Sequence, residues 1–408
     1  MGIHVYNEIG RLKKVLLHRP GDEFLNLTPN TLQRLLFDDI PYLKKAQEEH
    51  DAFAKALRDE GVEVVYLTDL MAETLNINNK IRDKFIKQFI REGGVTSDIV
   101  FDLVYKYLNH YKDNKSLVEK CIAGIDSEDL KGYRPSSGFF STRDIGKMIL
   151  DPLPNLYAPR DPFASIGKGV SIHKMFSVTR SRETIFAEYI FKYHPEYKLT
   201  PRYYERTYPY SIEGGDIEVL SKEVIAIGIS ERTEPDAINL LAKKIFETKG
   251  NRFKYILAFD IPDERSFMHL DTVLTRVDVN KFTVHSKVMD VTKVFEITKG
   301  KKEVSIKELH MPLDKILKKY LKLDKIELIK CGGGKRIPAE REQWSDGANL
   351  LAIKPGVAIA YDRNHVSNEV FRKHGIKIIE IPSSELSRGR GGPHCMSMAL
   401  EREDVWLI

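Results

Sequence analysis

The chain has 408 residues, of which 42% are hydrophobic and 30% charged, and its formal net charge is +5. This composition is typical of a globular protein with one large domain or two to three smaller ones, and so small a charge is not that of a nucleic-acid-binding protein. No apolar run approaches the roughly 18 residues of a membrane span, and three cysteines do not indicate a disulfide framework. We therefore expect a cytoplasmic protein in a reducing compartment, without a membrane partner.

The first predicted elements are strands and helices that follow one order. Segment 7–20, NEIGRLKKVLLHRP, predicts a polar start and then a hairpin. Segment 57–67, LRDEGVEVVYL, predicts the end of a helix, a glycine with positive φ and a β-branched strand. The same order recurs in segments 245–259 and 371–381, and in segment 320–331 without the glycine.

Residues 71–150 interrupt this order. AETLNINNKIRDKFIKQFIREGG and SDIVFDLVYKYLNHYK place apolar residues at helical spacing and carry few strand signals. We predict an inserted helical domain at 71–150, packed beside an α/β domain formed by residues 1–70 and 151–408. The charged residues of the insertion are expected to form solvated faces.

A polar residue, a strand, a tight turn and a second strand recur through the rest of the chain. Asp161, Asp216 and Asp271 begin three equally spaced copies, Asp346 lies in a fourth, and segment 7–20 gives a first. Five such units, each with a helix and a further strand, predict radial repetition in a small propeller of mixed α/β blades. An α+β domain with several hairpins is the alternative.

Radial repetition would bring Asp161, Asp216 and Asp271 together at one axis. Buried carboxylates repel one another unless a cation lies between them. His269 and Asp271, two apart on a strand, could ligate a metal or form a base beside an anion, but the chain has no HExxH, CxxC or EF-hand motif. A planar guanidinium, with five N–H donors that carboxylates match in pairs, fits better.

Two arginines and a cysteine complete the chemistry that the residues suggest. Arg180 and Arg232 suit a carboxylate at the far end of the ligand, which would make the ligand arginine-like. Cys395 lies in RGRGGPHCMSM and is either a buried structural thiol or a nucleophile. His394 by itself is most simply a core or loop histidine. Cys121 and Cys331 are expected to be structural.

Taken together, these motifs resemble the arginine deiminase family of the guanidine-modifying superfamily. The resemblance implies a five-bladed α/β propeller (pentein-like) with an inserted helical bundle, residues 1–70 and 151–408 being the catalytic part. It also implies L-arginine as the substrate, a homodimer or higher homo-oligomer, and no metal or organic cofactor. It rests on FDDIP (37–41), LPNLY and RDPF (153–163), RSRET (180–184), IEGGD (212–216), SERT (230–233), FMHLDT (267–272), REQWSDG (341–347) and RGRGGPHCMSM (388–398).

The same resemblance implies a role for each matched residue. Those implied for the chemistry are Cys395 as nucleophile, His269 as general acid and base, Glu213 as its carboxylate partner, and Asp161 and Asp271 as the groups that grip the guanidinium. Those implied for substrate binding are Asp216 near the guanidinium, Asn155, Arg180 and Arg232 at the α-carboxylate, and Arg390 with the backbone of Gly389 in a closing loop.

The implied reaction is hydrolysis of L-arginine to L-citrulline and ammonia through a covalent thiouronium on Cys395. One departure from the family is the pair Ala158–Pro159 before Arg160–Asp161, where the family commonly has an aromatic residue and threonine. An aromatic ring would pack on the substrate, whereas alanine leaves space. The alternatives are therefore a catalytically impaired arginine-binding paralogue and a related amidinotransferase.

Overall fold

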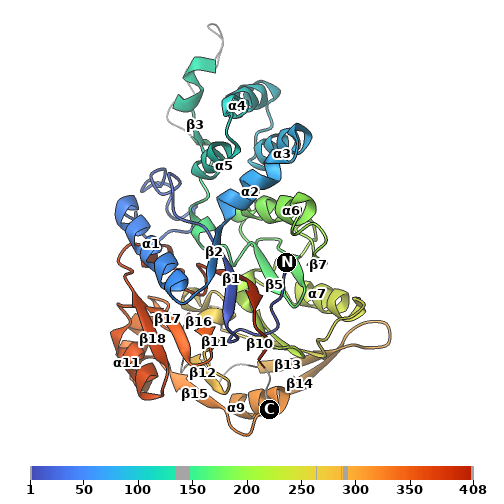
Figure 1. The fold of residues 1–408 in the computed structure, drawn as a ribbon, viewed down its shortest axis with the longest axis vertical. Helices are drawn as coiled ribbons and strands as arrows, with labels where there is room; N and C mark the ends of the chain where they lie inside the picture. Colours follow the sequence, from blue (N-terminus) through green and yellow to red (C-terminus); the bar gives the residue numbers. More distant parts are fainter. Residues whose placement is uncertain (1, 134–147, 263, 286, 288–292, 406–408) are drawn as a thin grey trace.

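The computed structural model describes residues 2–133, 148–262, 264–285, 287 and 293–405. The chain folds into several small sheets with helices around them, and a group of helices extends from one end of the molecule (Figure 1). The predicted mixed α/β class is confirmed. No helix within the described ranges is both long and apolar enough to cross a membrane.

Five groups of three strands share one pairing pattern. In each group a central strand pairs antiparallel with one neighbour and parallel with the other, and a helix lies between the two parallel strands along the chain. The strands, central one second, are β19 (Met398–Arg402), β1 (Leu12–Leu17) and β2 (Glu63–Tyr66); β5 (Phe163–Ile166), β6 (Gly169–Ile172) and β7 (Arg202–Tyr204); β8 (Ile217–Ser221), β9 (Val224–Ile229) and β10 (Tyr255–Asp260); β11 (Leu274–Arg276), β12 (Lys281–Val284) and β15 (Glu327–Lys330); β16 (Leu351–Lys354), β17 (Val357–Tyr361) and β18 (Lys377–Ile381).

The helices between the parallel strands bury one face against the sheets. They are α1 (Leu43–Asp59), α6 (Glu183–Tyr193), α7 (Pro235–Glu247), α9 (Leu313–Leu321) and α11 (His365–Lys373). In α1 the buried residues recur at helical spacing, from Ala46 through Phe53 to Leu57. The predicted positive φ occurs at Gly61, Gly250 and Gly375, and the segment without a glycine uses Lys322 at 57°.

The first group of strands differs from the prediction of a local hairpin in segment 7–20. That segment contributes only β1, and its antiparallel partner β19 comes from the other end of the chain, where Leu16 lies opposite Met398. Sequence spacing gives no signal for a pairing between strands so far apart. Both ends of the chain therefore meet in one sheet.

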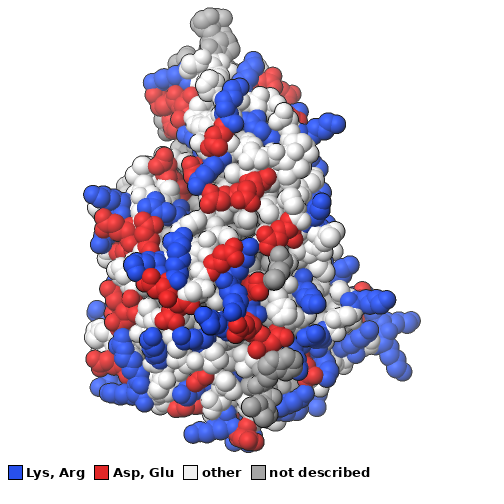
Figure 2. Space-filling view, viewed as in Figure 1, with Lys and Arg blue, Asp and Glu red and all other residues white. Residues whose placement is uncertain are grey.

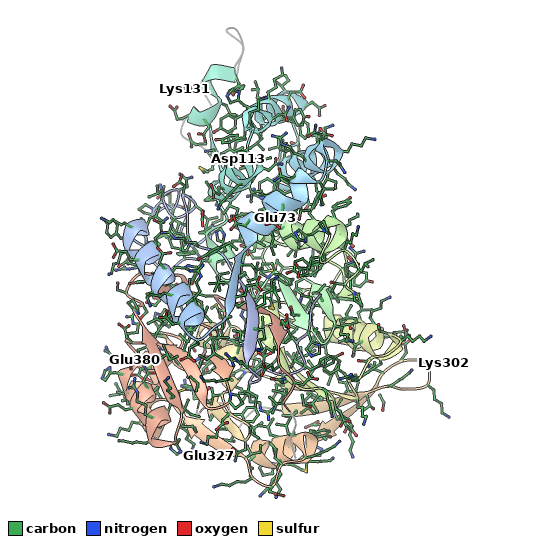
Figure 3. All side chains as sticks on the ribbon, viewed as in Figure 1. Glu73, Asp113, Lys131, Lys302, Glu327 and Glu380 are labelled. Atoms are coloured by element: carbon green, nitrogen blue, oxygen red, sulfur yellow. The ribbon has the colours of Figure 1, made fainter. Side chains whose placement is uncertain are left out.

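A hairpin formed by β13 (Lys293–Thr298) and β14 (Ser305–Leu309) extends the sheet of β8, β9 and β10, because β13 pairs with β10. Figure 3 places Lys302 at the far end of this hairpin. Positive and negative side chains are intermixed over most of the face drawn in Figure 2, as expected for solvated surfaces. A short helix, α10 (Arg336–Gln343), precedes β16.

The helices at one end of the molecule fall within the predicted insertion or at its edge. They are α2 (Leu67–Asn76), α3 (Asn79–Glu92), α4 (Asp98–His110) and α5 (Asn114–Ala123), followed by the short strands β3 (Ile125–Asp126) and β4 (Met148–Leu150). Asn78, Ser97 and Asp113 cap the starts of α3, α4 and α5 through their side chains. The boundaries at 71 and 150 stay a prediction, and residues 134–147 lie outside the described residues.

Candidate active site

A cavity of about 260 Å³ gathers most of the residues that the sequence analysis selected. Its wall comes from loops far apart in the chain. The predicted residues in the wall are Asn155, Asp161, Arg180, Arg232, His269, Gly389, Arg390 and Cys395, and Ala158 also lies there. Glu213, Asp216 and Asp271 are not in the wall and are fully buried behind it.

The site residues occupy similar positions in successive strand groups. Asp161 lies two residues before β5, Glu213 lies immediately before the turn η5 (Gly214–Asp216) that leads into β8, and His269 immediately before the turn η7 (Leu270–Thr272) that leads into β11. Cys395 lies in the loop before β19. The loops before the first strands of the groups thus converge on the cavity, as the repeat predicted.

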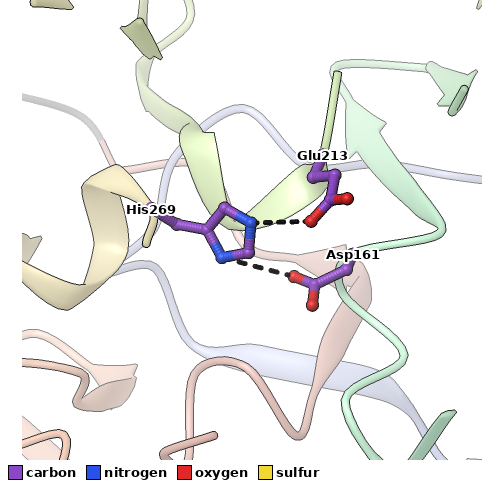
Figure 4. Close-up of side chains that lie close together, drawn as sticks. All are labelled: Asp161, Glu213 and His269. Carbon is purple, nitrogen blue, oxygen red and sulfur yellow. Dashed lines mark hydrogen bonds and ion pairs between the residues drawn. The ribbon is translucent and has the colours of Figure 1, made fainter. Parts of the chain in front are cut away.

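His269 lies between two carboxylates (Figure 4). Its Nε2 donates a hydrogen bond to Glu213 Oε2 at 2.9 Å, and its Nδ1 lies 3.8 Å from Asp161 Oδ1. A Cβ on Gly215 would lie 2.5 Å from Nδ1 of the ring, so the close approach requires glycine in IEGGD. The sequence placed these residues in separate motifs, and the structure brings them together.

The charges around His269 determine its protonation. Burial alone would lower the pKa of His269, but Asp161, the hydrogen bond to Glu213 and the charge of Asp216 raise it well above its usual value. Burial would raise the pKa of Glu213, and the hydrogen bond to His269 with the charges of Arg232 and Arg180 lowers it instead. The pair is therefore an imidazolium and a carboxylate at neutral pH.

Cys395 lies against Asp271 at the other side of the cavity. Its Sγ is 3.6 Å from Asp271 Oδ2, and the backbone N–H of Cys395 donates to Asn349 Oδ1 at 3.1 Å. Burial, with the charges of Asp271, Asp161 and Asp346, raises the pKa of the thiol well above its usual value. A cation bound between these carboxylates would oppose that effect.

His394 has a role that the sequence analysis missed. It was expected to be a core or loop histidine, and it is fully buried, but its Nδ1 donates to Asp271 Oδ2 at 2.8 Å. This bond, against the effect of burial, lowers the pKa of Asp271. The position of His394 directly before Cys395 was the only signal in the sequence.

Arg180 is buried beside the carboxylates rather than exposed to the cavity alone. Its Nη1 donates to Asp161 Oδ2 at 2.7 Å, and its Nη2 and Nε bond to Glu183. Glu183, three residues further along RSRET, was also missed, although this spacing on a helical turn is typical of an ion pair. Asp161 Oδ1 has no hydrogen bond among the described residues.

Arg232 and Asn155 lie on the wall near Arg180. Arg232 Nη1 is 3.7 Å from Glu213 Oε2 and its guanidinium lies over the ring of Phe176. Asn155 donates from Nδ2 to the backbone of Leu35 at 2.7 Å, and its own carbonyl oxygen accepts from Arg180. Two guanidinium groups thus share one part of the wall, where a carboxylate would find donors.

Asp216 is not brought to the cavity. Its oxygens accept hydrogen bonds from Ser230 Oγ, Thr233 Oγ1 and the backbone N–H of Leu270, at 2.7, 2.6 and 2.9 Å. Burial raises the pKa of Asp216 to about 6. The residue therefore ties the SERT turn, which carries Arg232, to the start of η7 beside His269.

The RGRGG loop covers the cavity from the C-terminal side. A Cβ on Gly389 would lie 2.7 Å from the ring of Phe37 and from the hydroxyl of Tyr157, so this contact excludes any side chain. Arg390 has a left-handed φ of 59°, and its guanidinium lies over the ring of Trp344 at 3.9 Å.

One ligand atom each from Asp161, Glu213 and His269 lie within 4.8 Å of one another, which is close enough for a metal ion. However, Glu213 Oε2 already accepts from His269, and Asp161 Oδ2 from Arg180. Arg180 and Arg232 both lie within 4 Å of Glu213 and add positive charge that opposes a metal cation. The donor set is better suited to an organic cation that supplies hydrogen bonds to oxygen.

Comparison with known proteins points in one direction. The family model described as arginine deiminase matches residues 33–402. Arginine deiminase of Treponema denticola is 53% identical over 406 residues, covering 99% of both chains. Arginine deiminase of Clostridium perfringens is 52% identical over 409 residues, covering 99% of this chain and 98% of the other.

Solved structures resemble the fold at much lower identity. The amidinotransferase SxtG from Microseira wollei gives a TM-score of 0.55 at 15% identity, covering 99% of this chain and 98% of the other. A dimethylarginine dimethylaminohydrolase adduct with S-methyl-L-thiocitrulline gives 0.51 at 16% identity, covering 95% and 99%. These likenesses concern the mixed α/β fold.

Proposed function

This chain belongs to the arginine deiminase family and is an enzyme that hydrolyses L-arginine to L-citrulline and ammonia, and we propose that Cys395 is its nucleophile. The observation that carries the proposal is the position of Cys395 Sγ, 3.6 Å from Asp271, in a cavity whose wall also contains Asp161 and His269. A thiol, an imidazole and carboxylates around one space suit attack on a flat cation.

The substrate would lie with its guanidinium between Asp161 and Asp271. The buried oxygens Asp161 Oδ1 and Asp271 Oδ1 have no hydrogen bond among the described residues and are available to N–H donors. Arg180, Arg232 and Asn155 would bind the α-carboxylate side, and Arg390 with Gly389 would close the loop over it. Asp216 would act at a distance, by holding the turn beside His269.

In the first half of the reaction the sulfur attacks the central guanidinium carbon. The bound cation stabilises the thiolate that the carboxylates otherwise disfavour. A carbon–sulfur bond forms and gives a tetrahedral adduct. His269, held as an imidazolium by Glu213 and Asp161, gives its proton to the leaving nitrogen, and ammonia departs. The substrate remains on Cys395 as a thiouronium.

In the second half water replaces the sulfur. His269, now neutral, takes a proton from water as the oxygen attacks the same carbon. The second tetrahedral adduct collapses, the carbon–sulfur bond breaks, and citrulline leaves with Cys395 again as the thiolate. Glu213 keeps the ring oriented in both halves. The protons balance without a metal or an organic cofactor, as the sequence analysis expected.

We further infer that the five strand groups stand around a common axis as the blades of a propeller, with residues 71–150 as a helical insertion. The shared pairing pattern and the pairing of β19 with β1 support this arrangement. A homo-oligomeric, cytoplasmic enzyme without nucleic-acid partners remains a proposal that rests on the family. Ala158 in the cavity wall leaves the affinity for arginine open to measurement.

Incubation of the purified protein with L-arginine tests the proposal. We expect citrulline and ammonia in equal amounts, and we expect Cys395→Ser to abolish both while arginine still binds. Cys331→Ser, which alters another buried thiol far along the chain from the site, serves as the matched control and should retain turnover.

Other outcomes separate the alternatives. Citrulline formation by Cys395→Ser at the wild-type rate would falsify the assignment of the nucleophile. Arginine binding by the wild type without any product would indicate an impaired paralogue. Consumption of arginine only when an amine acceptor is added, without ammonia, would indicate an amidinotransferase.

A further inference from the structure

A line of three buried charged side chains leads away from Cys395 into the interior. His394 Nδ1 donates to Asp271 Oδ2 at 2.8 Å, and His394 Nε2 lies 3.4 Å from Glu8 Oε2. All three are at most 4% exposed. They come from the N-terminal segment, the turn before β11 and the loop before β19, so only the folded chain assembles them.

Both ends of this line are fixed by the backbone. Glu8 Oε1 accepts from the N–H of Val219 at 3.1 Å, which leaves Oε2 for His394. The carbonyl oxygen of His394 accepts from Arg160 Nε at 2.8 Å. The imidazole of His394 is therefore held at both ring nitrogens and at its own backbone.

The hydrogen-bond roles determine the charges. Both ring nitrogens of His394 face carboxylate oxygens, and a carboxylate can only accept, so both nitrogens donate. Burial would raise the pKa of Glu8, but His394, Arg160 and Arg402 lower it to about 2. Glu218, buried nearby, is the other carboxylate close to this group. An imidazolium between two carboxylates is the arrangement that satisfies the geometry.

We propose that Glu8 is a positioning residue for the reaction: it holds His394 so that His394 occupies one oxygen of Asp271 and leaves the other for the substrate guanidinium. Asp271 Oδ1 lacks a hydrogen bond among the described residues, as this role requires. Without Glu8, the His394 ring loses one of its two partners and Asp271 loses its fixed orientation. The inference rests on the proposed function, because it assigns Asp271 to the guanidinium.

The test measures arginine binding by calorimetry in the Cys395→Ala protein, in which no turnover occurs. Adding Glu8→Gln keeps the shape of the side chain and removes its charge, and we expect arginine to bind about 10-fold more weakly or worse. Glu8→Asp keeps the charge and should restore part of the affinity. In the protein with Cys395 intact, Glu8→Gln should lower kcat/KM by a similar factor.

Glu23→Gln is the matched control. Glu23 is as buried as Glu8, accepts from His18 Nε2 at 2.9 Å and from one backbone N–H, that of Gly21, and lies in the wall of a different cavity. Its substitution carries the same structural cost at a distance from Asp271. We expect Glu23→Gln to lower the melting temperature as Glu8→Gln does and to leave arginine binding unchanged.

The outcomes are distinct. Arginine affinity within two-fold of the Cys395→Ala parent after Glu8→Gln would overturn the proposal, and so would equal losses of affinity in the Glu8 and Glu23 variants. If Glu8→Gln does not fold, His394→Gln is measured in the same way, and unchanged affinity there overturns it too. If arginine binds the wild type but no citrulline forms, the proposed function fails while the binding test of Glu8 still stands.

Discussion

At the scale of single residues, His269 is defined by the charges that contact it. Two carboxylates approach its two ring nitrogens, at 2.9 and 3.8 Å, and Asp216 adds a third negative charge nearby. These interactions outweigh burial, which would favour the neutral ring. The residue is therefore charged before the substrate binds and can act first as an acid.

This charge state predicts a titration. Since its pKa is raised, His269 should remain an imidazolium at pH 8 and lose its proton only as the pH rises further. Glu213→Gln removes the hydrogen-bonded anion and should lower the pKa of His269 by about one unit or more. Nitrogen NMR of labelled imidazoles in the unliganded protein measures both values.

The control is Glu231→Gln, which removes a carboxylate from the exposed rim of the same cavity and should barely change the titration. A His269 that titrates near pH 6.5 in the wild type would contradict this description. So would a Glu213→Gln protein in which the pKa of His269 is unchanged.

The sequence allowed part of the site to be predicted at this scale. Residues with distinctive neighbours, such as Cys395 in its glycine-rich loop and His269 two before Asp271, were selected from motifs and lie at the cavity or directly behind it. Glu8 and Glu183 were not selected, because their importance depends on partners that folding supplies. Asp216 was placed at the substrate, whereas three hydrogen bonds hold it beneath the site.

At the scale of elements, helix α1 holds the loop that closes the cavity. The buried carboxylate of Glu49 accepts hydrogen bonds from Ser384 Oγ at 2.6 Å and from the backbone N–H groups of Glu385 and Leu386 at 3.0 Å. These groups form the start of the turn η9 (Leu386–Gly389), which leads to Arg390. One side chain on a helix thus satisfies the donors at the beginning of the turn.

Glu49→Gln should lower the free energy of unfolding by about 1–3 kcal/mol, because an amide turns donors toward donors that are buried. Denaturant unfolding followed by circular dichroism measures the loss. Glu48→Gln changes the neighbouring, exposed residue, which pairs with Lys45, and should stay within about 0.5 kcal/mol of the wild type. Equal stability of the Glu48 and Glu49 variants would contradict the role of Glu49.

Helix and strand positions were easier to predict than their partners. The order of helix, positive-φ residue and strand was visible in segments 57–67, 245–259 and 371–381, because glycine and β-branched residues act locally. The pairing of β1 with β19 is not local and left no signal. The extension of one sheet by β13 and β14 was not visible for the same reason.

At the scale of the whole molecule, the helices at one end share a core with the strand groups. Phe85 on α3 contacts Phe186 and Tyr189 on α6, with ring centroids 6.0 and 5.5 Å apart, and Phe89 also contacts Phe186. A separately folding insertion would not bury aromatic rings across its boundary. The helices therefore support α6, whose preceding turn η4 (Val178–Arg180) carries Arg180.

The site itself is a property of the whole chain. Its residues lie in loops from different strand groups, and the strands at both ends of the chain close one sheet beside Cys395. Carboxylates that would repel one another are held together by Arg180, Arg232, His269 and His394. Folding thus assembles a space for a flat cation next to one sulfur atom.

Intact mass spectrometry of an acid-quenched reaction tests the covalent mechanism most directly. Wild-type protein and His269→Ala, which slows proton transfer, are mixed with L-arginine and quenched at increasing times. We predict a transient species heavier than the protein by arginine less ammonia, mapped to Cys395 and absent from Cys395→Ser. Citrulline formation while the protein keeps its unmodified mass at every time, in both proteins, would contradict the mechanism.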